Sequence, residues 1–377
     1  MACGSGKTLA ALWIAENLEA KLVLLLVPSL SLVGQTLAEW RRSSKESFRY
    51  LVVCSDETVV RGEDTTVHST RDLGVPVTTD VGDVRRFINE SHRSTATYVF
   101  CTYQSSPVVA EAQARANQPF DLVIADEAHR CASAKQTAFG TVLNEKRIKA
   151  KRRLFMTATP RYFTGRVKKR AAELEYEIAS MDDESLFGPV FHKLTFNAAI
   201  GAGLLTDYQV VVIGVSDSEK GLWAEEGRLV RTRGGATTDA RTLASQIGLA
   251  KATRKYDLRR VITFHSSIKK AVLFTNPAKP ESYPSVVTRI GRRQRPSGEI
   301  WATHISGEMP AGRRRTLLEE FRNLDENTRG VISNCACLGE GVDVPTLDGI
   351  AFIDPKRSMV DIIQAVGRVI RIRFGQS

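Results

Sequence analysis

The stretch that decides the fold runs from Phe120 to Arg130 and reads FDLVIADEAHR. Its apolar residues, from Phe120 to Ala125, have the pattern of a parallel strand buried on both faces. The run ends at two adjacent carboxylates, Asp126 and Glu127, with His129 close behind. In a nucleoside triphosphatase, one such carboxylate holds Mg²⁺ and the next orients or deprotonates the attacking water. The same residues also fit an ordinary helix start after a strand, so a second element is needed to decide.

A candidate phosphate-binding loop lies upstream, where residues 1–8 read MACGSGKT directly before an amphipathic helix. Glycines let backbone amides approach phosphates, a lysine supplies charge to the outer phosphates, and a threonine hydroxyl can ligate Mg²⁺ at the helix start. The first position of this motif normally holds glycine and here holds Met1. Together with the acidic pair, the loop predicts a site for ATP and Mg²⁺. Its residues are Gly4, Ser5, Gly6, Lys7, Thr8 and Asp126, with Thr8 and Asp126 on the metal.

The remaining elements alternate in the way that an open parallel sheet requires. The pattern predicts strands near residues 22–27, 50–54, 97–101, 122–125 and 153–156, and helices near 30–41, 81–92, 105–116 and 134–144. Ligands gather at the carboxyl ends of strands in such sheets, so the polar turns that follow the strands should meet at one edge. Each hydroxyl-rich turn taken alone also fits a helix cap.

The charge of the chain favours a polyanionic partner. The 377 residues carry a formal net charge of +11, and from Lys146 to Arg170 there are eleven Lys or Arg and no acid. A surface that contacts phosphates explains this stretch better than a solvated helix face, which usually mixes charges of both signs.

Cysteine usage and hydropathy favour a cytoplasmic protein without a membrane partner. The six cysteines are scattered, and the one close pair, Cys335 and Cys337, lacks a second pair at zinc-ligand spacing. No apolar run reaches the roughly 18 residues of a membrane span, and the amino terminus does not resemble a signal peptide.

The ordered motifs GSGKT, PSLSLVGQTLAEW, FCTYQS, DEAH and TATP resemble the first RecA-like domain of superfamily 2 DEAH-box helicases, in the branch with the translocating subunits of type I and type III restriction enzymes. In the second half, residues 261–267 (VITFHSS), 339–345 (GEGVDVP) and 364–371 (QAVGRVIR) resemble the fourth, fifth and sixth motifs. Other stretches of the sequence also resemble bacterial helicases that carry helicase-associated repeats after the motor domains. The resemblance implies an α/β fold of two tandem RecA-like domains, each a mostly parallel sheet with helices on both faces.

The resemblance also implies residue roles. Glu127 would be the catalytic base, Arg368 and Arg371 would reach the transferring phosphoryl group, and Gln364 would sense the nucleotide. Gly341 and Asp343 join the nucleotide-binding set. Contacts to the nucleic-acid backbone are implied for Ser29, Thr102, Tyr103, His265, Ser266 and Asp343, and coupling between strand and site for His129, Thr157 and Thr159. Such contacts hold position without reading sequence, so little base specificity is expected.

Where the sequence pattern turns irregular, we predict a linker at residues 196–207, which separates a first domain at 1–195 from a second domain at 208–377. The second domain is predicted to begin with a strand at 208–215, followed by a helix at 240–256. The family carries a strand before the phosphate-binding loop and another after the sixth motif, and the sequence contains neither. We therefore expect Met1 to be an internal methionine of a longer protein, or the chain to be a decayed remnant.

Three functions fit the sequence. The first is an ATP-dependent nucleic-acid translocase or helicase that hydrolyses ATP between its two domains and moves along DNA. The second is a truncated, non-catalytic DNA-binding remnant, and the third is the motor part of a restriction or defence system with a nuclease or modification partner. DNA or RNA specificity, polarity, unwinding or duplex translocation, pathway and oligomeric state are left open by the sequence.

Overall fold

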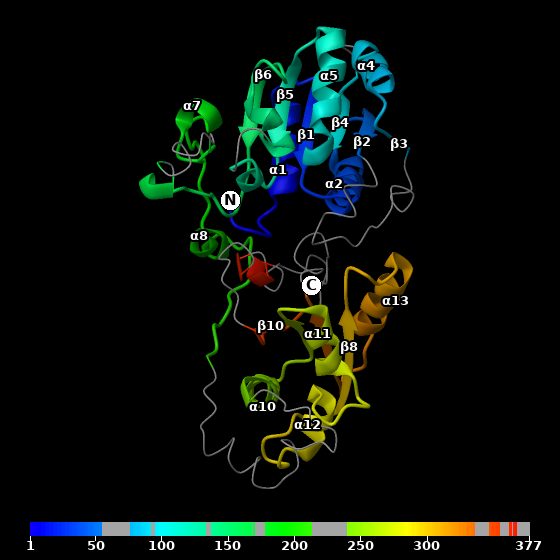
Figure 1. Cartoon of the computed structure of the whole chain (residues 1–377), viewed down its shortest axis with the longest axis vertical. Helices are drawn as coiled ribbons and strands as arrows, with labels where there is room; N and C mark the ends of the chain where they lie inside the picture. The colour runs from blue at the N-terminus through cyan, green and yellow to red at the C-terminus, as the bar shows by residue number, and fades with distance from the viewer. Residues whose placement is uncertain are drawn as a thin grey trace. The chain divides into compact units, whose positions relative to one another are not determined.

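The computed structural model describes residues 1–54, 76–91, 95–132, 137–167, 169, 178–212, 240–335, 347–354, 362, 363 and 365–367. By its internal contacts the chain divides into two compact units, Met1–Leu205 and Thr206–Ser377. Each unit contains its own sheet (Figure 1). Each also has its own hydrophobic core.

Unit 1 is built on a six-stranded parallel sheet with the order β3-β2-β4-β1-β5-β6. Because every neighbouring pair is parallel, the chain returns across a face of the sheet between strands, and helices occupy these crossovers. The strands are β1 (Leu22–Val27), β2 (Arg49–Val53), β3 (Val77–Thr78), β4 (Thr97–Thr102), β5 (Phe120–Ala125) and β6 (Ala150–Phe155). The α-helices are α1 (Lys7–Asn17), α2 (Leu30–Ser43), α4 (Val81–Asn89), α5 (Ser106–Ala116), α7 (Glu184–Phe187) and α8 (Phe196–Gly201).

The central strand β1 shows why the sheet needs cover on both sides. All of its residues are buried, and they alternate between two cores, with Leu24 in one and Leu25 in the other. Helices α4 and α5 contribute to the first core, and α1 and α2 to the second. Burying one such aliphatic side chain contributes about 1.5–3 kcal/mol. The unbroken apolar run therefore requires a helical layer on each face.

Unit 2 repeats this plan on a four-stranded parallel sheet with the order β10-β7-β9-β8. One core lies under α10 and α12, and the core of the opposite face includes side chains of α13. The strands are β7 (Arg260–Phe264), β8 (Glu299–Ile305), β9 (Thr328–Asn334) and β10 (Gly349–Phe352). The helices are α10 (Ala240–Lys255), α11 (Ile268–Thr275), α12 (Tyr283–Arg289) and α13 (Ala311–Arg322). The predicted α/β fold of two mostly parallel sheets is confirmed.

The helix predicted at residues 134–144 is wrong in type. Its described part forms 3₁₀-helix η4 (Ala138–Leu143). Gly140 in the centre, with the β-branched residues Thr141 and Val142 beside it, lowers α-helix propensity. A short 3₁₀ turn still buries these residues against the core.

The strand predicted at residues 208–215 is also wrong over its described part, because residues 208–212 form no regular element. Val210 and Val212 leave 79% and 91% of their surfaces exposed. A β-branched run becomes a strand only where a neighbouring strand accepts its hydrogen bonds and a layer covers it. Strand β6 begins earlier than predicted, and its first residues include exposed Lys151 and Arg152, as suits the edge position.

Among the described residues, no helix combines the length and the apolar character needed to cross a membrane.

Candidate functional site

The glycine-rich loop turns sharply into α1. Gly4 and Gly6 have φ angles of 81° and 85°, in the left-handed region that glycine adopts without strain. Gly6 caps α1, and Lys7 and Thr8 form its first turn. The buried Trp40 of α2 donates from Nε1 to the Thr8 carbonyl over 2.9 Å. This bond fixes the helix start against its neighbour, a contribution that the sequence patterns did not reveal.

The acidic turn follows β5 at the same edge of the sheet. Asp126 donates its backbone N–H to Leu26 of the adjacent β1, and Ala128 donates to Met156 beyond β6. Between them, Glu127 has φ 48° and ψ 47°, a left-handed conformation that is uncommon for a residue with a side chain. Such strain persists where the surrounding structure holds it, and it concentrates at functional sites.

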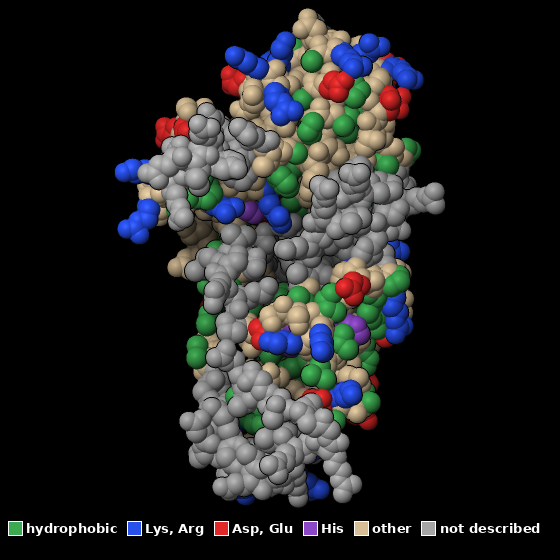
Figure 2. Space-filling view, viewed as in Figure 1, with side chains coloured by type: hydrophobic (Ala, Val, Ile, Leu, Met, Phe, Trp, Pro, Cys, Tyr) green, Lys and Arg blue, Asp and Glu red, His purple; other side chains and the backbone are tan. Residues whose placement is uncertain are grey.

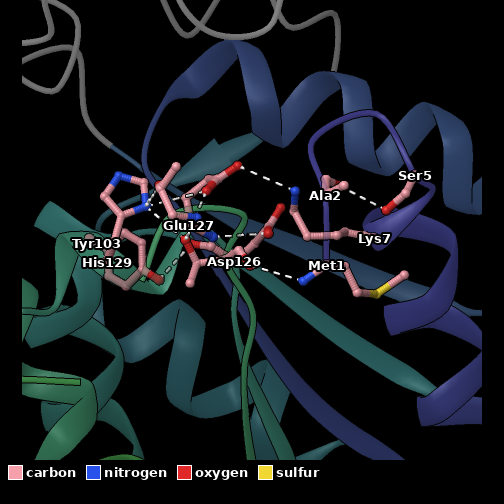
Figure 3. A network of polar contacts seen from close by, with 10 residues as sticks. Met1, Ala2, Ser5, Lys7, Tyr103, Asp126, Glu127 and His129 are labelled. Atoms are coloured by element: carbon pink, nitrogen blue, oxygen red, sulfur yellow. Dashed lines mark hydrogen bonds and ion pairs between the residues drawn. The ribbon is translucent and has the colours of Figure 1, made fainter. Parts of the chain in front are cut away.

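The glycine-rich loop and the acidic turn lie side by side, as Figure 3 shows. Lys7 Nζ lies 3.8 Å from Glu127 Oε1, and both side chains are largely buried. Burial raises the pKa of the Glu127 carboxyl, but a hydrogen bond from His129 and the charges of Lys7 and Arg130 lower it, and the result is a pKa below the ordinary value. Glu127 is therefore ionised at neutral pH and can accept a hydrogen bond or a proton.

A second contact set joins the acidic turn to the turn after β6. His129 Nδ1 lies 3.0 Å from Thr157 Oγ1, 3.3 Å from Thr159 Oγ1 and 3.3 Å from Glu127 Oε2. The backbone N–H of Thr159 also donates to Thr157 Oγ1 over 3.0 Å. The three residues predicted for coupling are thus brought together beside the carboxylate.

The donor set suits a magnesium–triphosphate ligand. Mg²⁺ is usually held by one or two protein oxygens together with phosphates and waters, and the Thr8 hydroxyl and the Asp126 carboxylate belong to the two turns that meet here. Within the described part of the chain, no three His, Cys, Asp or Glu side chains form a metal cluster. The two oxygen donors of Thr8 and Asp126 fit a cation that phosphates help to hold.

The residues of unit 1 predicted to contact nucleic acid are buried. Ser29 caps α2 by accepting from the Leu32 N–H, and the Thr102 hydroxyl donates to Ser105 Oγ over 3.3 Å. Tyr103 is fully buried, and its hydroxyl donates to the Asp126 carbonyl over 2.7 Å. These side chains point inward, which the spacing of the motifs did not indicate.

In unit 2, His265 and Ser266 follow β7 and differ in exposure. His265 is 2% exposed and its Nε2 lies 3.0 Å from Thr263 Oγ1. Burial lowers the pKa of His265 to about 4. Ser266 is exposed, and its backbone N–H donates to Asp354 Oδ2 over 2.8 Å. Asp354, which also pairs with Lys270, was not singled out from the sequence.

The remaining predicted site residues, Gly341, Asp343, Gln364, Arg368 and Arg371, lie outside the described residues. The basic stretch at 146–170 begins before edge strand β6, runs through it and continues after it, and exposed Lys151 pairs with Asp121. Figure 2 shows Lys and Arg side chains dispersed over the visible face of each unit rather than gathered in one patch.

A glycine-rich loop that opens a helix, beside an acidic turn at the carboxyl end of a parallel strand, defines a P-loop nucleoside triphosphatase. Comparison with known proteins narrows this class. Residues 1–162 match the family described as the res subunit of type III restriction enzymes, and residues 254–373 match the helicase conserved C-terminal domain. The chain belongs to the superfamily 2 helicases, in the branch of the type I and type III restriction enzymes.

Individual proteins that are similar to this chain are also helicases or restriction-modification enzymes. The chain is 30% identical over 373 residues to the probable helicase A859L of African swine fever virus (isolate Pig/Kenya/KEN-50/1950), covering 98% of this chain and 36% of the relative. It resembles the ATP-dependent Type ISP restriction-modification enzyme LlaBIII bound to DNA, with a TM-score of 0.79, 30% identity, and coverage of 100% of this chain and 25% of that one. A nuclease-deletion mutant of the Type ISP enzyme LlaGI, in complex with a DNA substrate mimic, gives a TM-score of 0.65 at 27% identity, covering 100% and 24%. The chain thus spans about a third of the length of its curated relatives.

Proposed function

We propose that this chain is an ATP-driven motor that moves along DNA, with Lys7, Thr8, Asp126 and Glu127 as its hydrolytic centre in unit 1. The observation that carries the proposal is the convergence of Lys7 on Glu127, because it unites residues more than a hundred positions apart that have little structural reason to meet. A family resemblance alone would allow a decayed site. The close approach of Lys7 to Glu127 favours catalysis over the non-catalytic remnant.

Each residue has a chemical task. The loop amides and Lys7 bind the β- and γ-phosphates. Thr8 and Asp126 would hold Mg²⁺, which would supply positive charge beside these phosphates. Glu127 orients the attacking water and accepts its proton, while His129 holds the Glu127 carboxylate by hydrogen bonding. When phosphates draw Lys7 away from Glu127, the carboxylate loses a cation and becomes a stronger base.

We propose DNA as the nucleic acid along which the motor moves, because the two Type ISP structures that resemble this chain are described with DNA or a DNA mimic. The net charge of +11 also favours a polyanion. Because those enzymes are restriction-modification proteins, we propose that the motor serves a restriction or defence system with a nuclease or modification partner. We assign cleavage of DNA to the partner and not to the described residues of this chain.

The test is Mg²⁺-dependent ATP hydrolysis with no nucleic acid, with single-stranded DNA and with duplex DNA. The Glu127→Gln variant should keep ATP binding and lose about 10²-fold or more of the turnover, because it cannot accept a proton. Glu111→Gln is the matched control, since Glu111 is exposed on α5 and pairs only with Arg115 among the described residues. Its turnover should equal that of the wild type.

The DNA form that stimulates turnover separates a helicase from a duplex translocase. A folded protein that binds DNA in a salt-sensitive manner without hydrolysing ATP would instead support the non-catalytic remnant.

A further inference from the structure

Tyr103 occupies an unusual place between the predicted nucleic-acid turn and the hydrolytic centre. It opens 3₁₀-helix η2 (Tyr103–Ser105) directly after β4 and is fully buried. Its ring stacks on Phe139 of η4, with 5.5 Å between ring centroids and 25° between planes. The ring therefore cannot reach a strand of nucleic acid without leaving the core.

The hydroxyl of Tyr103 bonds to the backbone of the acidic turn. It donates to the carbonyl oxygen of Asp126 over 2.7 Å (Figure 3). Burial, then interaction with Cys131, raises the pKa of the Tyr103 hydroxyl well above its ordinary value, and burial raises the pKa of the Cys131 thiol to about 12. Both groups stay protonated, so the hydroxyl remains a donor while the thiol can donate to its oxygen.

The accepting carbonyl belongs to the peptide group that links Asp126 to Glu127. The N–H of the same peptide donates to Asp126 Oδ1 over 2.9 Å. A planar peptide held at both ends cannot rotate, whereas one held only through a side-chain carboxylate can. Its orientation matters because it sets the left-handed backbone of Glu127, at φ 48°, and thereby the direction of the Glu127 carboxylate.

We propose that Tyr103 is a positioning residue for ATP hydrolysis: its hydroxyl locks the Asp126–Glu127 peptide and so aims the Glu127 carboxylate at the attacking water. This inference rests on the proposed function of Glu127. It assigns Tyr103 to the hydrolytic centre in place of a direct contact with nucleic acid.

The test compares Tyr103→Phe with Tyr98→Phe. Each variant removes one hydroxyl from a buried tyrosine of the β4 segment. Tyr98 lies near the opposite end of the strand, about 17 Å away at the rise of a β-strand. Tyr103→Phe should lower kcat about tenfold with the KM for ATP nearly unchanged, because the binding groups of the loop are untouched. Tyr98→Phe should leave both constants unchanged.

Amide hydrogen exchange over residues 126–130 gives a readout that does not depend on turnover. Tyr103→Phe should speed exchange there, and Tyr98→Phe should not. If Tyr103→Phe does not fold, Phe139→Leu loosens the same ring and should produce smaller changes in the same direction.

The inference fails if the variant that folds keeps wild-type kcat and wild-type exchange, or if KM alone rises. If the wild type itself shows no ATPase activity, the proposed function fails separately. Unchanged exchange in Tyr103→Phe would then overturn the peptide lock, and faster exchange would support the lock without a catalytic role.

Discussion

The phosphate-binding loop depends on the backbone conformation of a single residue, Gly6. Gly6 has φ 85°, and a Cβ atom placed on it would meet no atom within 4 Å. Substitution by alanine therefore tests backbone strain without a steric clash. A left-handed alanine costs about 1–2 kcal/mol, and relief of that strain would turn the loop amides away from the phosphates.

We expect Gly6→Ala to weaken ATP binding about tenfold, which corresponds to about 1.4 kcal/mol. Equilibrium titration with a fluorescent ATP analogue measures the effect. Gly201→Ala is the control, because Gly201 also has open space but lies in α8 without a positive φ. Equal affinities for Gly6→Ala and the control would contradict a role for the loop conformation.

The buried imidazole of His265 predicts a pH-dependent stability. Burial lowers its pKa from 6.5 to about 4, with Lys270 lowering it further and Asp354 opposing. Below pH 6.5 the imidazole of His265 binds a proton in the unfolded chain but stays neutral in the folded chain. The free energy of unfolding is therefore highest above pH 6.5 and falls as the pH drops toward the folded pKa of about 4. The loss should reach about 1.5 kcal/mol between pH 6.5 and about pH 5.

Urea unfolding at these pH values measures the loss. His265→Gln should flatten the dependence, while the exposed His192→Gln should retain it. Half-buried His304, whose pKa burial also lowers, adds a smaller change in the same direction. A wild type with equal stability at both pH values would refute the prediction.

Residue identity and spacing predicted that the glycine-rich loop and the acidic turn would meet at one edge of the sheet, and Lys7 Nζ does lie 3.8 Å from Glu127 Oε1. Identity and spacing did not predict that the side chains of Tyr103 and His265 are buried. A motif shows which turn a residue occupies, but burial of its side chain depends on residues of other elements, Phe139 of η4 for Tyr103 and Phe274 of α11 for His265. Asp354 and Trp40 carried no local signal for the same reason.

At the scale of elements, apolar runs predicted the central strands well, since β1 and β5 are buried on both faces. Edge strand β6 was placed too late because its charged first half does not resemble a buried strand. The valine-rich segment at 208–212 shows the opposite failure, since strand propensity alone did not produce a strand over these residues.

Close packing of β9 against the end of α13 gives an element-scale prediction. A Cβ atom on Gly330 would lie 2.6 Å from Leu324 Cδ1 and 2.7 Å from the Phe321 ring. Both side chains pack against one core of unit 2, so they cannot easily move aside. Gly330→Ala should destabilise unit 2 by about 1–3 kcal/mol through overpacking.

Gly312→Ala on α13 itself is the matched control, since its Cβ would meet nothing within 4 Å. It should stabilise the protein by about 0.5–1 kcal/mol through helix propensity. Opposite shifts in the urea midpoint are expected, and a Gly330→Ala variant as stable as wild type would show that β9 and α13 are not tightly packed.

For the whole molecule, the division between Leu205 and Thr206 lies inside the stretch predicted as a linker, although α8 packs as part of unit 1. The sequence predicted a linker in this stretch because its pattern becomes irregular there, with a short helix that contains Gly201 and Gly203. The proposed function requires both units, because the hydrolytic residues belong to unit 1 while Arg368 and Arg371 belong to the second half of the chain, within the match to the helicase C-terminal domain.

This dependence can be tested with Arg368→Lys and Arg371→Lys. Lysine keeps the charge but loses the planar fork that arginine offers to a phosphoryl group. Each variant should lose about a thousandfold in single-turnover hydrolysis with duplex DNA present, while ATP binding by the loop of unit 1 stays intact. Arg293→Lys, at an exposed position of unit 2, should hydrolyse ATP at the wild-type rate. If all three variants retain wild-type rates, unit 1 hydrolyses ATP by itself, and unit 2 must contribute to movement along DNA in some way other than through these arginines.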